Sequence, residues 1–148
     1  MRDSRLYEIL IAPTETTKEI RDLMERTDTL AWSMIPGAIR YDTIKVQTSP
    51  RDRMAETMGD IDELYHELRG LFLRRATEEE RILGLCRACG DLTDVERDVI
   101  VYRYVYRAKW EQISGYLNLR ERRPFQIHQS ACDKLAAFLW PVIVMPVG

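Results

Sequence analysis

The chain has 148 residues, of which 45% are apolar and 31% are charged, and its formal net charge is −2. This composition favours one helix-rich domain, alone or with a helical arm, and leaves enough apolar side chains for a core. No run approaches about 18 apolar residues, so we expect no membrane span, and the N-terminal pattern is not that of a secretory signal. An odd count of three cysteines argues against a secreted disulfide framework, which favours a cytoplasmic location.

The first long helix is predicted to begin near Thr16. Thr16 and Glu19 have the spacing of a capping box, in which a hydroxyl and a carboxylate satisfy free amides at a helix N-terminus. Apolar residues follow at helical spacing as far as Met34, and Pro36-Gly37 end the pattern. We therefore expect an N-terminal helical segment over residues 1–35 and a connector over residues 36–50.

The next helix is predicted to begin at Ser49-Pro50, with the serine as N-cap and the proline in the first turn. Thr77 and Glu80 have another capping-box spacing, so residues 51–90 form either one long helix or a helical hairpin. Within this region an apolar stripe repeats every 3.5 residues, a spacing typical of helices that pair side by side. The stripe consists of Met54, Met58, Ile61, Tyr65, Leu68 and Phe72, and Leu64 and Leu71 widen it.

An apolar stripe on a long helix must pack against another helix. The partner is either the helix over residues 16–34 or a second copy of the protein. We expect a homodimer, with residues 51–90 serving packing or dimerisation.

Residues 91–148 contain signals for three further helices. Thr93 and Glu96 predict a helix over about 94–106, although the β-branched and aromatic run 101–105 leaves a strand as a local alternative. A short helix is expected over 110–117, then a turn, then a basic helix over about 121–139, followed by an apolar tail that Pro141 and Pro146 interrupt. The predicted buried residues of the basic helix are Ile127, Ala131, Leu135 and Phe138.

A helix, a short helix, a turn of three to four residues and a basic helix form the pattern of a helix-turn-helix, whose last helix enters the major groove of DNA. Residues 107–134 hold six basic and three acidic side chains, a local basic excess. Arg122, Gln126 and Gln129 would share the outward face, and these residue types read guanine and adenine edges. Phosphate contacts are expected from Arg107, Lys109 and Arg120, and from Arg123 at the helix start.

A series of spaced residues in this region carries a family resemblance. They are Leu92-Thr93, Arg97, Ile100, Arg103-Tyr104, Trp110-Glu111-Gln112-Ile113, Leu117, Ile127-His128 and Leu135. Through them, residues 92–139 resemble region four of the major bacterial sigma factors and, more closely, phage late transcriptional regulators of the RinA/ArpU type. Tyr41 and residues 46–50 resemble the stretch before the long helix of those phage proteins. The resemblance implies a phage or prophage transcription regulator, and it also implies contact with RNA polymerase.

The sequence departs from this family at three positions. Glycine is usual at Arg107-Ala108, serine at Arg120 and an apolar residue at Pro124. Because proline is tolerated only in the first turn of a helix, we expect the last helix to begin near Arg123, with Glu121 and Arg122 still in the turn.

Cys86 and Cys89, with His128 and Cys132, match the ligand types of a tetrahedral zinc site. The 38 intervening residues far exceed the spacing of a compact finger, and cysteines on an apolar helix face are ordinarily small hydrophobes, so we predict neither a metal nor another cofactor. Whether the four side chains approach one another is left open. No phosphate-binding glycine loop or nucleophile motif is present, so no enzymatic activity is predicted.

The sequence thus predicts an all-α protein with an N-terminal helical, partly coiled-coil region and a sigma-region-four-like helix-turn-helix domain over residues 91–148. Its expected function is sequence-specific binding of double-stranded DNA in transcription regulation. Two alternative functions also involve DNA or transcription: a packaging adaptor such as a small terminase subunit, and a sigma-like factor that binds RNA polymerase. A pure protein-interaction module is a third alternative.

Overall fold

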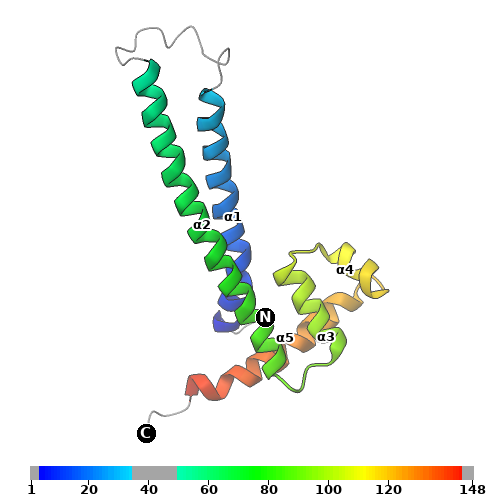
Figure 1. The fold of residues 1–148 in the computed structure, drawn as a ribbon. Coiled ribbons are helices and arrows are strands. Elements are labelled where there is room, and N and C mark those ends of the chain that lie inside the picture. The colour runs from blue at the N-terminus through cyan, green and yellow to red at the C-terminus, as the bar shows by residue number, and fades with distance from the viewer. Residues whose placement is uncertain (1–3, 35–49, 145–148) are drawn as a thin grey trace. The chain divides into compact units, whose positions relative to one another are not determined.

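All regular secondary structure in residues 4–34 and 50–144, the part of the chain that this computed structural model describes, is helical (Figure 1). This confirms the predicted all-α fold class for those residues. Not one of the described helices is both long and apolar enough to cross a membrane. In chain order the elements are α1 (Ser4–Ser33), α2 (Pro50–Ala88), α3 (Asp94–Ile100), the π-helical segment η2 (Val101–Val105), α4 (Trp110–Leu117) and α5 (Arg123–Val144).

The described residues divide into two compact units. The larger unit comprises residues 4–15 and 75–144, and the hairpin unit comprises residues 16–34 and 50–74. Helices α1 and α2 therefore each contribute one part to the larger unit and one part to the hairpin unit. The larger unit takes in more of the chain than residues 91–148 alone.

Helix α1 begins at Ser4, so the predicted start near Thr16 is wrong. Thr16 lies inside the helix with its side chain buried, and its hydroxyl accepts a hydrogen bond from Arg74 Nε at 3.3 Å. The helix also passes through Pro13, which removes one backbone hydrogen bond. Leu6 and Leu10 are fully buried before this proline, so packing in the larger unit stabilises the turns that local sequence signals disfavour.

Helix α2 is a single helix from Pro50 to Ala88, which decides between the one-helix and the hairpin interpretation of residues 51–90. Pro50 is its first residue, as predicted, whereas Thr77 lies inside the helix and not at a helix start. Apart from Pro50, the predicted connector over residues 36–50 lies outside the described residues.

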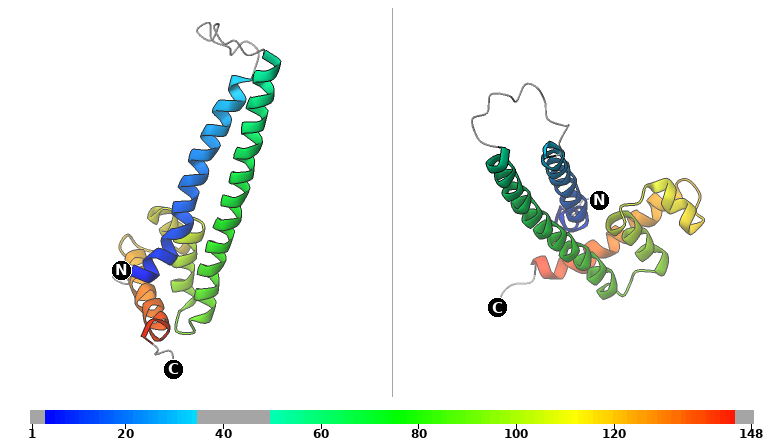
Figure 2. Two further views of the ribbon diagram at one scale, coloured as in Figure 1. Left: turned by 90° about the vertical axis from the view of Figure 1, so that its left-hand side faces the viewer. Right: turned by 45° about the horizontal axis from the view of Figure 1, so that its top comes forward.

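In the hairpin unit, the part of α1 after Glu15 and the part of α2 before Arg75 lie side by side (Figure 2). Its core contains Leu23 from α1 with Leu64 and Leu68 from α2, and the half-buried Leu30 and Leu71 pack against them. An ion pair between Glu19 and Arg74 joins the same two helices.

The face that α2 turns toward α1 differs from the predicted stripe. Leu68 is buried and Ile61 is half-buried, but the other four stripe residues are exposed, at 48% for Met54, 54% for Met58, 57% for Tyr65 and 40% for Phe72. The predicted 3.5-residue period is present, but the contact with α1 is made by Leu68 together with Leu64 and Leu71, the two residues predicted to widen the stripe. Most of the stripe itself lies on an exposed flank.

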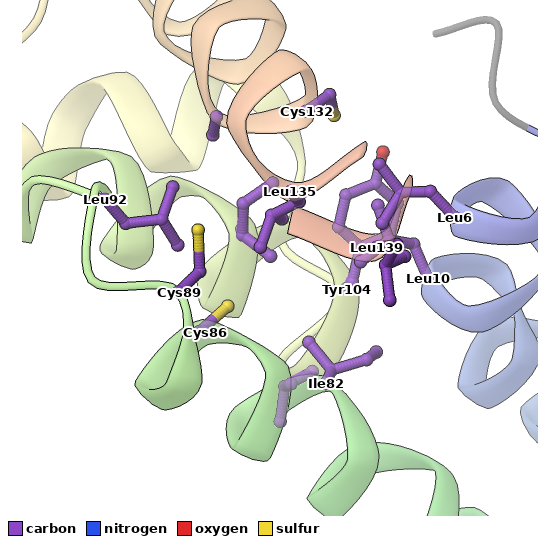
Figure 3. Packing of buried hydrophobic residues seen from close by; sticks show 13 residues of the cluster. Leu6, Leu10, Ile82, Cys86, Cys89, Leu92, Tyr104, Cys132, Leu135 and Leu139 are labelled. Atoms are coloured by element: carbon purple, nitrogen blue, oxygen red, sulfur yellow. The ribbon is translucent and has the colours of Figure 1, made fainter. Parts of the chain in front are cut away.

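The core of the larger unit draws on both ends of the chain (Figure 3). Phe138, which was predicted to be buried, is exposed, and Leu139 occupies the core instead. Helix α5 also continues past Pro141 to Val144, although that proline was expected to interrupt it. The core residues are Leu6, Leu10, Ile82, Cys86, Cys89, Leu92, Ile100, Tyr104, Val105, Ala131, Cys132, Leu135 and Leu139.

The capping box that opens α3 is present as predicted. The Thr93 backbone N–H donates to Glu96 Oε1 at 2.8 Å, and the Glu96 N–H donates to Thr93 Oγ1 at 3.2 Å. After Ile100 the chain continues as the π-helical η2, so the strand alternative for residues 101–105 is wrong. Tyr106 N donates to Val101 O at 3.1 Å, the i to i−5 bond of a π-turn.

Candidate nucleic-acid interface

Residues 118–122 connect α4 to α5 (Figure 1). Asn118 ends α4 in the left-handed conformation, with φ 53° and ψ 49°, and Leu119 N donates to Ser114 O at 2.9 Å. The connection is longer than the expected three to four residues. Pro124 explains the difference, because proline is accommodated only in the first turn and α5 therefore begins late, at Arg123.

The N-terminal half of α5 has one buried and one exposed side. Ile127, Ala131 and Leu135 are buried as predicted, and Pro124 is buried with them. The opposite side exposes the polar residues that were predicted to read bases. They are Arg122, Gln126 and Gln129, at spacings of four and three, with Arg122 in the turn that precedes the helix.

Several of these side chains interact with neighbours on the same helix. Arg123 Nη1 donates to Gln126 Oε1 at 3.3 Å, and Gln129 Nε2 donates to Asp133 Oδ1 at 2.9 Å. Each glutamine keeps a polar atom that this contact does not use, the amide nitrogen in Gln126 and the amide oxygen in Gln129.

Two more predicted phosphate contacts lie at opposite ends of α4. Lys109 is the N-cap residue of α4, and its backbone N–H donates to Gln112 Oε1 at 2.8 Å. Arg120 lies in the turn, where its carbonyl accepts from Arg123 N at 2.9 Å. Both side chains are exposed, so six of the seven predicted contact residues lie on the surface.

Arg107 is the seventh, and it is engaged within the protein. Its Nη1 lies 2.9 Å from Glu79 Oε2 and 2.8 Å from the Val105 carbonyl oxygen, and the charged side chains of this ion pair are less than one third exposed. This geometry ties the connection between η2 and α4 to α2, which favours a structural role for Arg107 over phosphate contact.

An aromatic contact that sequence reasoning missed supports the start of α5. Phe125 is 48% exposed and stacks in a tilted arrangement on Trp110, with ring centroids 4.8 Å apart. The guanidinium of Arg103 lies 4.6 Å from the Trp110 ring centre. Phe125 adjoins Gln126, so the exposed side of α5 also offers an aromatic edge of the kind that contacts thymine methyl groups. The sequence signal that could have identified Phe125 was its helical spacing, three residues after Arg122.

A buried carboxylate fixes α5 against the start of α3. Glu96 accepts hydrogen bonds from Ser130 Oγ and, at 2.7 Å, from Lys134 Nζ, which also donates to the Asp91 carbonyl at 3.1 Å. Burial alone would raise the pKa of Glu96, but the bonds from Lys134, Ser130 and Thr93 outweigh it and hold the pKa at about 2. The orientation of the exposed side of α5 therefore depends on an ionised Glu96.

Of the residues that were weighed as zinc ligands, the three cysteines lie in the core and His128 is half-buried. His128 Nε2 lies 2.6 Å from the Tyr104 hydroxyl and 3.5 Å from Cys132 Sγ, while Cys89 Sγ faces the Lys134 carbonyl at 3.8 Å. Burial raises the pKa of Cys132 to about 11 and lowers that of His128 to about 4. Among the described residues no group of three or more His, Cys, Asp or Glu is arranged to hold a metal ion.

Comparisons with protein-family models, with curated proteins and with solved structures found no match. The function is therefore inferred from the residues of this chain and their geometry.

Proposed function

We propose that the protein is a sequence-specific DNA-binding transcription regulator, in which α4, the 118–122 turn and α5 act as a helix-turn-helix. Helix α5 enters the major groove with its N-terminal end. Arg122 and Gln126 contact base edges, and Lys109, Arg120 and Arg123 contact phosphates on either side.

One observation carries this proposal: the start of α5 is amphipathic in the way that a groove-reading helix requires. Its inner side is fixed by Ile127 and Ala131, and its outer side exposes Arg122 and Gln126. Arginine pairs with guanine and glutamine with adenine through two hydrogen bonds each, which gives these positions discriminating power. The positive end of the helix dipole adds attraction for phosphate at the same place.

The backbone at Arg107 supports the resemblance to sigma region four. Arg107 has a φ of 56°, in the left-handed region that glycine adopts at little cost. Glycine is usual at this place in the families that the sequence resembles. The connection between η2 and α4 thus has a backbone conformation that favours glycine, although this chain carries an arginine there.

The test is binding of the full chain to DNA fragments from the genome that encodes it, at two salt concentrations, with and without the double substitution Arg122→Ala/Gln126→Ala. We expect the wild type to select one fragment and to lose affinity as salt rises. The double variant should lose selectivity by tenfold or more while retaining most of its affinity for bulk DNA, because the phosphate contacts remain.

Arg21→Ala is the control, since it removes one exposed cation from α1 and leaves α5 unchanged. It should select the same fragment as the wild type. Equal selection by the wild type and the double variant would rule out α5 as the reading helix. A wild type that binds RNA polymerase but no free DNA would favour the sigma-like alternative, and a ring of about eight or more copies would favour the packaging adaptor.

A further inference from the structure

The hairpin unit has two flanks, and its contacts show which residues share each of them. Leu64 and Leu68 of α2 pack with Leu23 of α1, and the ion pair between Glu19 and Arg74 runs along one side of this seam. In an antiparallel helix pair, the residues that come directly after facing core residues of the two helices lie on the same side of the seam. Here that side is the one opposite the Glu19–Arg74 ion pair.

That other side is apolar and exposed. Met24 directly follows Leu23 on α1, while Tyr65 and Phe72 directly follow Leu64 and Leu71 on α2. Met58 lies two turns before Tyr65 on the same row. We name these four residues, Met24, Met58, Tyr65 and Phe72, the hairpin face; they are between 40% and 57% exposed.

Large apolar side chains gathered on one flank are typical of an interaction surface. The α2 row is symmetric about Tyr65, since the large apolar residues Met58 and Phe72 lie seven residues before it and seven residues after it. A second α2 laid antiparallel across Tyr65 would therefore place Met58 of each copy against Phe72 of the other. Such an isologous contact closes on itself and forms a dimer.

Two charges beside this row are arranged in the same way. Asp62 lies one turn before Tyr65 and Arg69 one turn after it, and both are exposed. In the antiparallel arrangement each Asp62 meets Arg69 of the second copy, so two opposite-charge pairs flank the central tyrosines. A parallel arrangement would place aspartate against aspartate and arginine against arginine, which like-charge repulsion disfavours.

We propose that the hairpin face is covered by a second copy of this chain, with the two α2 helices antiparallel about a two-fold axis at Tyr65. The dimer then contains four packed helices, two from each hairpin. This surface belongs to the hairpin unit and contains none of the DNA-contacting residues, so its role is independent of the proposed function.

The test is the molar mass of the full chain by sedimentation equilibrium, beside the variants Arg69→Asp, Tyr65→Glu and the charge swap Asp62→Arg/Arg69→Asp. The wild type should have twice the chain mass of 17.4 kDa. Arg69→Asp sets four aspartates around the axis and Tyr65→Glu sets two carboxylates on it, so each should weaken dimerisation at least tenfold. The charge swap restores both opposite-charge pairs and should recover most of the wild-type affinity.

Glu67→Lys is the matched control, because Glu67 is exposed on α2 on the flank of the Glu19–Arg74 ion pair. It should dimerise as the wild type does. Circular dichroism of each variant checks that the helices are retained, as expected for substitutions at exposed positions. A wild-type monomer at about 100 μM, a larger ring, or a charge swap no better than Arg69→Asp would each overturn the proposal.

Discussion

Arg107 combines two opposing effects in one residue. Its guanidinium bonds Glu79 and the Val105 carbonyl, which stabilises the connection before α4. Its backbone, at φ 56°, occupies a region that costs a residue with a Cβ atom about 1 kcal/mol or more. The side-chain contacts therefore hold a backbone conformation that glycine would adopt without strain.

Two substitutions at Arg107 separate these effects. Arg107→Ala and Arg107→Gly both remove the contacts with Glu79 and Val105, but only alanine keeps the Cβ atom. We expect both variants to be less stable than the wild type, and the glycine variant to be more stable than the alanine variant by about 1 kcal/mol. Urea unfolding measures the free energies. Equal stability of the two variants would mean that the left-handed conformation does not persist without the arginine.

Exposure of the site residues was within reach of sequence reasoning, but their internal partners were not. The helical period of Ile127, Ala131 and Leu135 identifies the buried side of α5, and the positions of Arg122 and Gln126 on the outer side follow from it. The ion pair of Arg107 depends on Glu79, 28 residues earlier on another helix. Local spacing rules do not predict such a contact. The sequence therefore did not distinguish Arg107, which is ion-paired within the protein, from a basic residue that is available to DNA.

At the level of the helices, Glu96 joins α3 to α5 because it makes hydrogen bonds at the start of α3 and to side chains of α5. Its backbone and carboxylate complete the capping box with Thr93, and the same carboxylate accepts bonds from Ser130 and Lys134 on α5. Because the side chain is buried, loss of its charge leaves the Lys134 ammonium without its anion. The angle between α3 and α5 is therefore set by an electrostatic contact as well as by packing.

Glu96→Gln tests this contact, because the amide oxygen can still accept from Thr93 while the charge is lost. We expect a loss of about 2 kcal/mol in unfolding free energy, less than the roughly 3–5 kcal/mol for a fully buried pair because Lys134 is one third exposed. Asp94→Asn, at the exposed partner of Arg97, should change stability by less than about 0.5 kcal/mol.

The same substitution should alter the acid response of stability. The pKa of Glu96 falls from 4.5 to about 2 on folding, so its contribution is complete above pH 4.5 and is lost as the pH falls toward 2. Urea unfolding between pH 5 and pH 2.5 should show a smaller loss in Glu96→Gln than in the wild type. If the pH dependence of the unfolding free energy is the same in both proteins, Glu96 does not contribute to it.

Three capping-box spacings show how far local signals reach. Only Thr93 with Glu96 forms the box, because the residues around Gly90 leave the helix before it. Thr16 and Thr77 have an acceptable partner three residues later, yet each lies inside a longer helix whose preceding turns are stabilised by burial. The start of α1 was therefore missed because Leu6 and Leu10 find their partners in a distant part of the chain.

At the scale of the whole molecule, the larger unit depends on residues from both ends of the sequence. Leu6 and Leu10 of α1 share one core with Leu135 and Leu139 of α5 (Figure 3). Sequence periodicity identified the α5 residues as helical, but it placed the start of the first helix only near Thr16, after Leu6 and Leu10, and it contained no information on the contact between the two groups. The heptad-like period of α2 was likewise visible, while the choice of Leu64 and its neighbours as the side facing α1 is settled only by packing.

This shared core predicts that a substitution near the N-terminus loosens the helix proposed to bind DNA. Leu10→Ala should lower the unfolding free energy by about 3 kcal/mol, because it opens a cavity at a fully buried position. Hydrogen exchange should then accelerate over residues 127–139 together with residues 4–15, since both belong to one cooperative unit. Tyr7→Ala, three residues earlier and half exposed, should leave the exchange of α5 close to that of the wild type. Faster exchange in residues 4–15 with α5 fully protected would show that the N-terminal turns are dispensable for that core, and DNA binding would then be insensitive to Leu10.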